Sequence, residues 1–130
     1  MIRYEALALA IACLNDAFNP TSKSFQLRNP GMLTSFRPEK KFEEGTGLRI
    51  FSSMMGGFKA LTADIQAKAA GKNPGLKPEA SLREMLILYK FKSDGDLQYI
   101  VRFLRKALLD ESVTGATPVT YFIELAVQES

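Results

Sequence analysis

The chain has 130 residues, of which 46% are hydrophobic and 24% are charged. This length and composition are typical of one globular domain, and they exclude a collagen-like or intrinsically disordered chain. The formal net charge is +3, but no long block of like charges occurs, so we expect no nucleic-acid partner.

The first predicted element is a helix from Tyr4 to Asp16. It is apolar around its whole circumference, which indicates a helix enclosed by protein. Its apolar run, Ala6 to Leu14, is shorter than the roughly 18 residues of a membrane span. Glu5 interrupts the charged-then-apolar order of a secretory signal. We therefore expect a central core helix and no membrane span.

An irregular segment with one hairpin is predicted next. Pro20 ends the first helix, and Asn29-Pro30-Gly31 and Arg37-Pro38 are turn sequences. Phe42 and the run 48–51 then flank a glycine-containing loop, a pattern typical of a β-hairpin. The sequence therefore predicts one small hairpin.

Two helices are predicted after the hairpin. Ser52 or Ser53 caps the first, which carries apolar residues at three- and four-residue spacing and stops at Gly71. Ser81 and Glu84 have the spacing of a capping box and begin the second.

Two more helices complete the chain. Residues 93–96 end the preceding helix and cap a new one, which reaches Leu108. Thr117-Pro118 begins the last helix. The apolar positions of this last helix are Tyr121, Phe122, Leu125 and Ala126. The fold class is thus mainly α (α+β): residues 1–130 form one domain of about five helices with one small β-hairpin.

The residue types limit the chemistry of any site. The absence of histidine excludes Ser-His and Cys-His nucleophilic pairs and imidazole metal ligands. Cys13 has no second cysteine to pair with and is predicted to be a buried small hydrophobe. Gly45 and Gly47 lack the strand-to-helix setting of a phosphate-binding loop. We expect no metal and no cofactor, and any acid-base chemistry would need carboxylates.

The stretch Asn15-Asp16-Ala17-Phe18-Asn19-Pro20 points to a family. It resembles the catalytic signature of the lysozyme-like superfamily, which includes lytic transglycosylases and phage-type muramidases. In that superfamily a catalytic Glu closes a buried helix and a Phe-Asn-Pro-like turn follows. Here Asn15 stands at the position of the Glu.

Further motifs are similar, in the same order, to one phage-related and bacterial branch of the superfamily. That branch has Asn-Pro-Gly-Asn-Leu, a Phe-Ala-Ile-Phe strand, a Gly-aromatic-x-Ala-Leu helix, and then a Leu-x-Glu helix followed by a Tyr-led helix. The matching segments here are 29–33, 48–51, 57–61, 81–84 and 94–99. The resemblance extends from about Leu7 to about Leu108 and implies a lysozyme-like fold with a glycan cleft.

Two departures from the family pattern bear on activity. Asn15 replaces the Glu, and Met32 replaces the last asparagine of Asn-Pro-Gly-Asn. An amide cannot protonate a leaving sugar oxygen, and general acid catalysis contributes roughly 10²- to 10⁴-fold. The resemblance therefore implies a degenerate, non-catalytic domain, a pseudoenzyme that binds a peptidoglycan-type glycan or is a structural module of a phage particle or a cell envelope. The candidate substrate-binding residues are Asn15, Phe18, Asn29, Met32 and Tyr89.

Two alternatives remain open. The first is an active muramidase or lytic transglycosylase that uses Asp16 or Glu44. Asp16 points about 100° away from Asn15 around a helix, and Glu44, beside Glu43, is typical of a solvated turn. The second is a protein-interaction subunit whose cleft is closed. The resemblance implies a bacterial cytoplasmic or phage-particle location, or the cell envelope if the chain is exported without cleavage.

Overall fold

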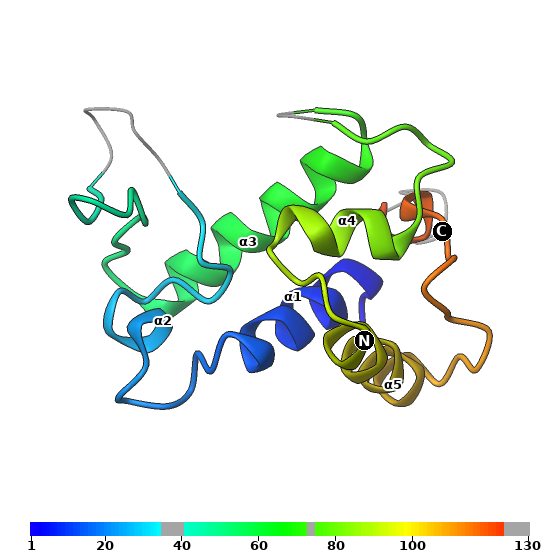
Figure 1. Cartoon of the computed structure of the whole chain (residues 1–130), viewed down its shortest axis with the longest axis horizontal. Helices are drawn as coiled ribbons and strands as arrows, with labels where there is room; N and C mark the ends of the chain where they lie inside the picture. The colour runs from blue at the N-terminus through cyan, green and yellow to red at the C-terminus, as the bar shows by residue number, and fades with distance from the viewer. Residues whose placement is uncertain (35–40, 73–74, 124–130) are drawn as a thin grey trace.

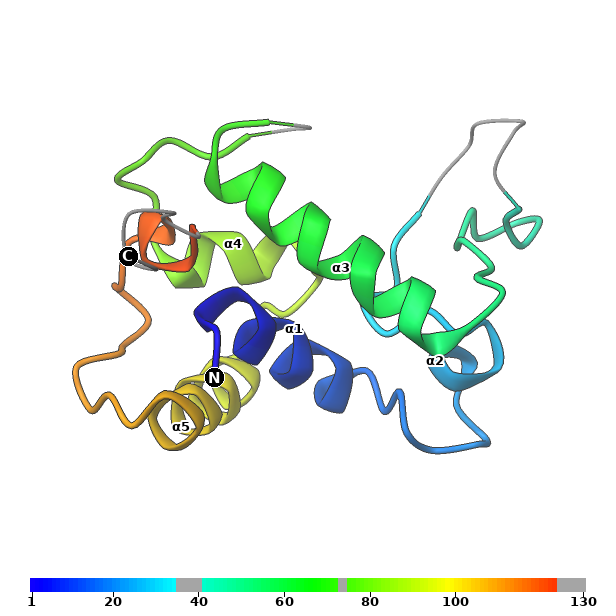
Figure 2. The ribbon, with the colours of Figure 1, turned by 180° about the vertical axis from the view of Figure 1, so that it is seen from behind.

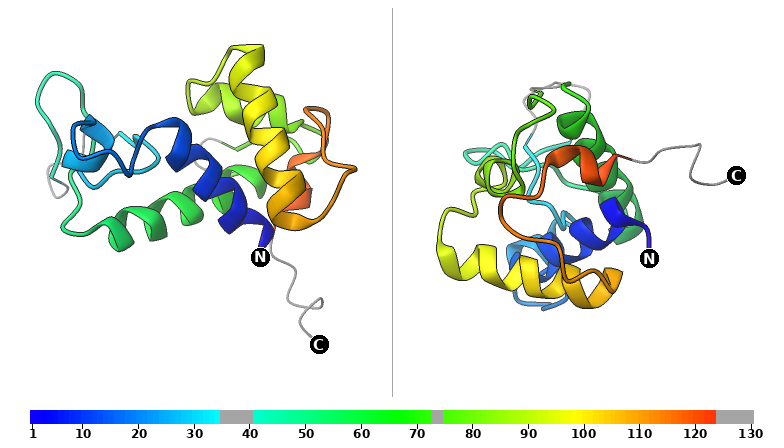
Figure 3. Two further views of the ribbon diagram at one scale, coloured as in Figure 1. Left: turned by 90° about the horizontal axis from the view of Figure 1, so that it is seen from below. Right: turned by 90° about the vertical axis from the view of Figure 1, so that its right-hand side faces the viewer.

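Helix α1 (Arg3–Leu14) crosses the middle of the molecule in the computed structural model, which describes residues 1–34, 41–72 and 75–123 (Figure 1). It packs against α3 (Met54–Ala69), α5 (Asp94–Leu108) and the 3-10 helix η1 (Val119–Phe122). Helices α3 and α5 lie on two sides of it (Figure 3). Its fully buried residues are Ala6, Leu7, Ala8, Ala10, Ile11 and Ala12. The predicted central core helix is confirmed, because helices surround its apolar surface on several sides.

The other described helices form two groups joined by α1 and α3. Their bounds are α2 (Lys23–Gln26), α3 (Met54–Ala69), α4 (Leu82–Leu88), α5 (Asp94–Leu108) and η1 (Val119–Phe122). The loop lobe contains α2 and the described chain of 20–34 and 41–52, and the helical lobe contains α4, α5 and η1 (Figures 1 and 2). The mainly helical fold class is confirmed.

The predicted helix starts are confirmed at three serines. The side chains of Ser53, Ser81 and Ser93 each accept a hydrogen bond from the backbone N–H three residues later. The carboxylate of Glu84 accepts a hydrogen bond from the backbone N–H of Ser81, which completes the capping box. Each such cap stabilises its helix by about 1 kcal/mol.

The predicted β-hairpin is not confirmed, since the described pairings are isolated bridges. Leu48 pairs with Thr34, whereas its neighbour Arg49 pairs with Phe42. The run 48–51 thus divides its pairing between two segments, and neither ladder extends over successive residues. Single backbone bonds, such as those from Glu43 N–H to the Leu48 carbonyl and from Arg49 N–H to the Leu33 carbonyl, and side-chain bonds to the backbone hold the loop lobe together.

The last predicted helix is also different. Its described part is the four-residue helix η1, and Leu125 and Ala126 lie outside the described residues. The chain just before η1 is tied to the start of α4, because Leu82 N–H donates to the carbonyl of Thr117 at 2.8 Å. Val119 N–H likewise donates to the carbonyl of Ala80 at 2.8 Å. These bonds flank Pro118, the predicted first helical residue, which is extended, so that helical structure begins at Val119.

Candidate functional site

A cavity of about 580 Å³, here called the inter-lobe cleft, lies where the two lobes meet over α3. Residues 31–34 and Arg49 of the loop lobe line one side, α3 lines the floor, and residues 88–90 at the C-terminal end of α4 line the other side. Thr34 and Lys90 are exposed, so the cleft opens to solvent. Its volume lies within the range of about 300–1,000 Å³ that is usual for small-molecule sites.

Three side chains form a polar cluster in the cleft. The ammonium of Lys68 and the hydroxyl of Tyr89 both donate to Oδ2 of Asp64, at 2.5 Å and 2.7 Å. The Lys68 nitrogen also lies 5.1 Å from the centroid of the Tyr89 ring. Lys68 is 9% exposed and Tyr89 is 6% exposed, so both polar groups are held close to the core. A buried charge is tolerated there because it is paired and hydrogen-bonded.

Tyr89 is a fixed donor in this cluster. Burial, first, and then the Asp64 carboxylate raise the pKa of the Tyr89 phenol far above its usual range. Tyr89 therefore keeps its proton at neutral pH, and Asp64 is the acceptor in both contacts.

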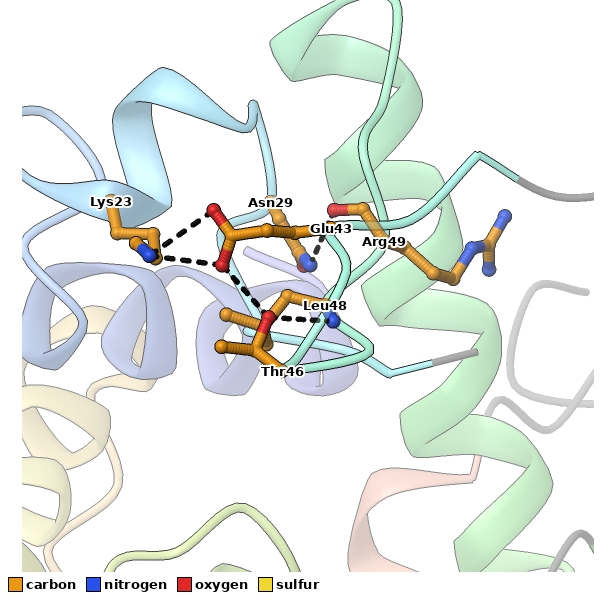
Figure 4. Close-up of polar contacts among 6 residues, drawn as sticks. All are labelled: Lys23, Asn29, Glu43, Thr46, Leu48 and Arg49. Atoms are coloured by element: carbon orange, nitrogen blue, oxygen red, sulfur yellow. Dashed lines mark hydrogen bonds and ion pairs between the residues drawn. The ribbon is translucent and has the colours of Figure 1, made fainter. Parts of the chain in front are cut away.

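Asn29 holds the loop-lobe wall of the cleft in place. Its side chain donates to the carbonyl of Leu33 at 2.9 Å and accepts from the N–H of Leu33 at 2.9 Å. It also donates to the carbonyl of Arg49 at 3.0 Å (Figure 4). It is 0% exposed. Asn29 thus joins the turn at 29–33 to the run 48–51 and positions Arg49 without facing the cleft itself.

Asn15 caps the C-terminus of α1 and is half-buried. Its side-chain N–H donates to the carbonyl of Pro30 at 2.9 Å. The amide therefore connects the central helix to the same turn that Asn29 holds. Asn15 lies behind the cleft wall and is absent from the residues that line the cleft.

Asp16 and Phe18 lie in the turn after α1, away from the cleft. Asp16 has a left-handed backbone (φ 60°), and its carboxylate accepts from the Asn19 amide at 2.8 Å. Phe18 is 56% exposed and stacks on Phe58 with ring centroids 6.1 Å apart. Both residues stabilise the local turn, and neither lines the cleft.

Glu43 and Glu44 belong to the exposed turn of the loop lobe. Lys23 donates to both carboxylate oxygens of Glu43 at 2.9 and 3.1 Å, and Thr46 donates to one of them at 2.8 Å (Figure 4). The bond from Lys23, then that from Thr46, lowers the pKa of Glu43 below its ordinary value. Glu44 is exposed, and neither carboxylate lines the cleft.

Met32 and Tyr89 are the two candidate residues that the structure brings together in the cleft. Met32 adopts a left-handed backbone with φ 50°, and so does Lys90 with φ 73°. Non-glycine residues in this conformation carry a backbone cost of about 1–2 kcal/mol and concentrate at ligand-binding sites. The cleft thus has a strained residue on each of its two sides.

Sequence reasoning missed the charged residues of the cleft. Asp64 and Lys68 stand four apart on a predicted helix, a spacing that was available as a signal for an ion pair. Nothing in the spacing of Arg49 or Lys90 relates them to that pair. The loop lobe and the chain around Tyr89, which bonds to Asp64 of α3, bring all four to one cavity.

Within the described ranges there is no group of three or more His, Cys, Asp or Glu side chains that could hold a metal ion. None of the helices in those ranges is long and apolar enough to cross a bilayer. No protein-family model, curated protein or solved structure matches the chain.

Proposed function

We propose that this chain is a glycan-binding module without glycosidase activity, belonging to a phage particle or a cell envelope, and that the inter-lobe cleft is its binding site. The observation that carries the proposal is the open cleft of about 580 Å³ with the Asp64–Lys68–Tyr89 cluster inside it. Few, precisely held polar groups in a cavity of this size are what orient a small polar ligand. The order of motifs similar to the lysozyme-like superfamily supports a glycan as that ligand.

The arrangement of carboxylates supports binding rather than hydrolysis. Glycoside hydrolysis uses two carboxyl groups, one of which donates a proton to the leaving oxygen. Among the described residues that line the cleft, Asp64 is the one carboxylate, and it accepts from Lys68 and Tyr89. Asn15, at the position of the family acid, is an amide committed to the Pro30 carbonyl.

Obstructing the cleft tests the proposal. Ala63 is an exposed α3 residue that lines the cleft, so Ala63→Trp fills the cavity with a large side chain. Lys59 is also exposed on α3 but does not line the cleft, which makes Lys59→Trp a matched control. We expect soluble peptidoglycan oligosaccharides to shift the NMR amide signals of residues 31–34 and 88–90 in the unmodified chain and in Lys59→Trp. Ala63→Trp should bind the same oligosaccharides at least about 10-fold more weakly.

The same samples report on catalysis. Incubation of the unmodified chain with purified peptidoglycan should release no soluble fragments, while the chain co-sediments with the insoluble wall. Release of fragments would contradict the non-catalytic part of the proposal. Equal binding by both tryptophan variants would place the ligand outside the cleft, and no binding by any of them would leave the protein-interaction alternative.

A further inference from the structure

The charges in the inter-lobe cleft are unbalanced. The described residues that line it include three cationic side chains, Arg49, Lys68 and Lys90, and one carboxylate, Asp64. The three cations come from the loop lobe, from α3 and from the chain after α4, so folding brings them to one cavity from three separate segments.

Asp64 compensates one of these cations. Its Oδ2 accepts from the Lys68 ammonium and from the Tyr89 hydroxyl, so the negative charge of Asp64 is matched inside the cluster. Arg49 and Lys90 then remain as cationic side chains without a matching carboxylate in the described lining. Cavity walls of low dielectric strengthen the field of such charges and attract anions.

Arg49 is held in position rather than loosely placed. Its backbone N–H donates to the carbonyl of Leu33 at 2.9 Å, and its own carbonyl accepts from Asn29. Its guanidinium carbon lies 4.4 Å from the centroid of the Phe51 ring. Figure 4 shows the side chain pointing away from the Lys23–Glu43 pair. Glu43 is therefore engaged elsewhere and does not compensate Arg49.

Lys90 stands on the opposite side of the cleft, directly after Tyr89. Its left-handed backbone at φ 73° turns the chain out of α4, and its side chain is exposed. An ammonium on one wall and a guanidinium on the other suit a ligand that carries negative charge along its length. Guanidinium groups bind carboxylates through two parallel hydrogen bonds, which adds geometric selectivity to the charge.

We propose that the cleft selects an acidic glycan, in which sugar units carry free carboxylates, over a neutral glycan of the same length, and that Arg49 and Lys90 make this selection. This inference rests on the proposed function, because it concerns the ligand of the same cleft. It adds that charge on the sugar substituents, and not the sugar backbone alone, determines affinity.

Three tetrasaccharides with the same β-1,4-linked backbone separate the selection for acidic glycans from glycan binding itself. The first is an N-acetylglucosamine tetramer, the second alternates N-acetylglucosamine with N-acetylmuramic acid bearing free lactyl carboxylates, and the third is the second with its carboxylates amidated. Each is titrated into the full chain by isothermal calorimetry. We expect the free acid to bind about 10-fold more tightly than its amide or the neutral tetramer, as charge-assisted bonds allow. The difference should shrink between about 50 mM and about 500 mM salt.

Two substitutions test the residues. Arg49→Gln keeps both backbone bonds of position 49. Lys90→Gln replaces an exposed charged side chain with an uncharged polar one. Both variants should therefore fold. Each should lower the affinity for the free acid by a larger factor than it lowers the affinity for the amide, so that the ratio of the two affinities falls toward one. Lys59→Gln, exposed on α3 and outside the cleft, is the matched control and should change neither affinity.

Each outcome has one meaning. Equal affinity for all three tetrasaccharides overturns the acidic selection while leaving the glycan-binding proposal in place. A preference for the free acid that neither Arg49→Gln nor Lys90→Gln reduces overturns the assignment to these residues. Binding of none of the three overturns the proposed function and this inference with it.

Discussion

Replacing the buried Asn29 by alanine should lower the free energy of unfolding more than the same replacement of an exposed asparagine. Asn29 is 0% exposed, and its amide makes three bonds of 2.9–3.0 Å to the backbone of Leu33 and Arg49. Alanine removes the whole amide and all three bonds, so the Leu33 N–H and the Arg49 carbonyl lose this partner, while the Leu33 carbonyl keeps its bond from the Arg49 N–H.

The expected loss follows from those three bonds. Each intramolecular hydrogen bond contributes about 1 kcal/mol net, and a buried group left without a partner costs about 1–3 kcal/mol. Leu33 and Arg49 are half-buried, so water can reach part of the freed backbone and the lower end applies. We expect Asn29→Ala to lower the free energy of unfolding by about 3 kcal/mol, a large share of the stability of a small domain.

Asn19→Ala is the matched control for this loss. The Asn19 side chain also makes three hydrogen bonds, to Asp16 and Thr21, but these bonds are exposed to water. Urea unfolding followed by circular dichroism, with linear extrapolation, measures both variants. Asn19→Ala should lose less than about 1 kcal/mol. Equal losses for the two variants, or a loss below about 1 kcal/mol for Asn29→Ala, would refute the role given to burial.

Three further changes have expected outcomes. Met32→Asn should raise the free energy of unfolding by about 0.5–1 kcal/mol, because asparagine tolerates the left-handed backbone at φ 50°; a lower thermal midpoint would contradict the strain at this position. Gly57→Ala should cost about 1–3 kcal/mol in urea unfolding, because its new Cβ would lie 2.2 Å from the Arg28 carbonyl oxygen. The bonds from Ser112, followed by that from Tyr121, lower the pKa of Asp110 from 3.8 to about 2. Asp110 therefore contributes stability above about pH 4 that is lost as the pH falls toward about 2. Asp110→Asn should flatten this part of the curve of stability against pH, and an unchanged acid slope would count against the pKa shift.

The helix starts could be predicted from the sequence because capping is local. Ser53, Ser81 and Ser93 bond to a backbone N–H only three residues away, so the residue types and their spacing contain most of the information. The central position of α1 could be predicted for a related reason, since a helix that is apolar all round must be enclosed. The bounds differ from the predicted ones by one or two residues.

The cleft could not be predicted in the same way because it depends on packing between distant segments. Asp64 and Lys68 alone have the spacing of an ordinary surface ion pair, and Tyr89 stands 25 positions after Asp64. Whether they bury one another depends on how α4 lies against α3. The hairpin is not confirmed for a similar reason. The sequence around 42–51 has the apolar flanks and glycines of a hairpin and contains the Phe42–Arg49 bridge, but Leu48 pairs with Thr34 from outside that segment.

The amide at position 15 is part of the architecture that shapes the cleft. It donates to the Pro30 carbonyl at 2.9 Å, and an ionised carboxylate, which has no hydrogen to donate, would face that carbonyl with a negative charge instead. Pro30 follows Asn29, whose side chain holds Leu33 and Arg49, so repulsion at position 15 would act on the same turn that supports the cleft wall. An ionised carboxylate at this position would therefore disfavour the present course of the chain at 29–33. The amide at position 15 and the backbone course of the cleft wall are therefore coupled features of the chain.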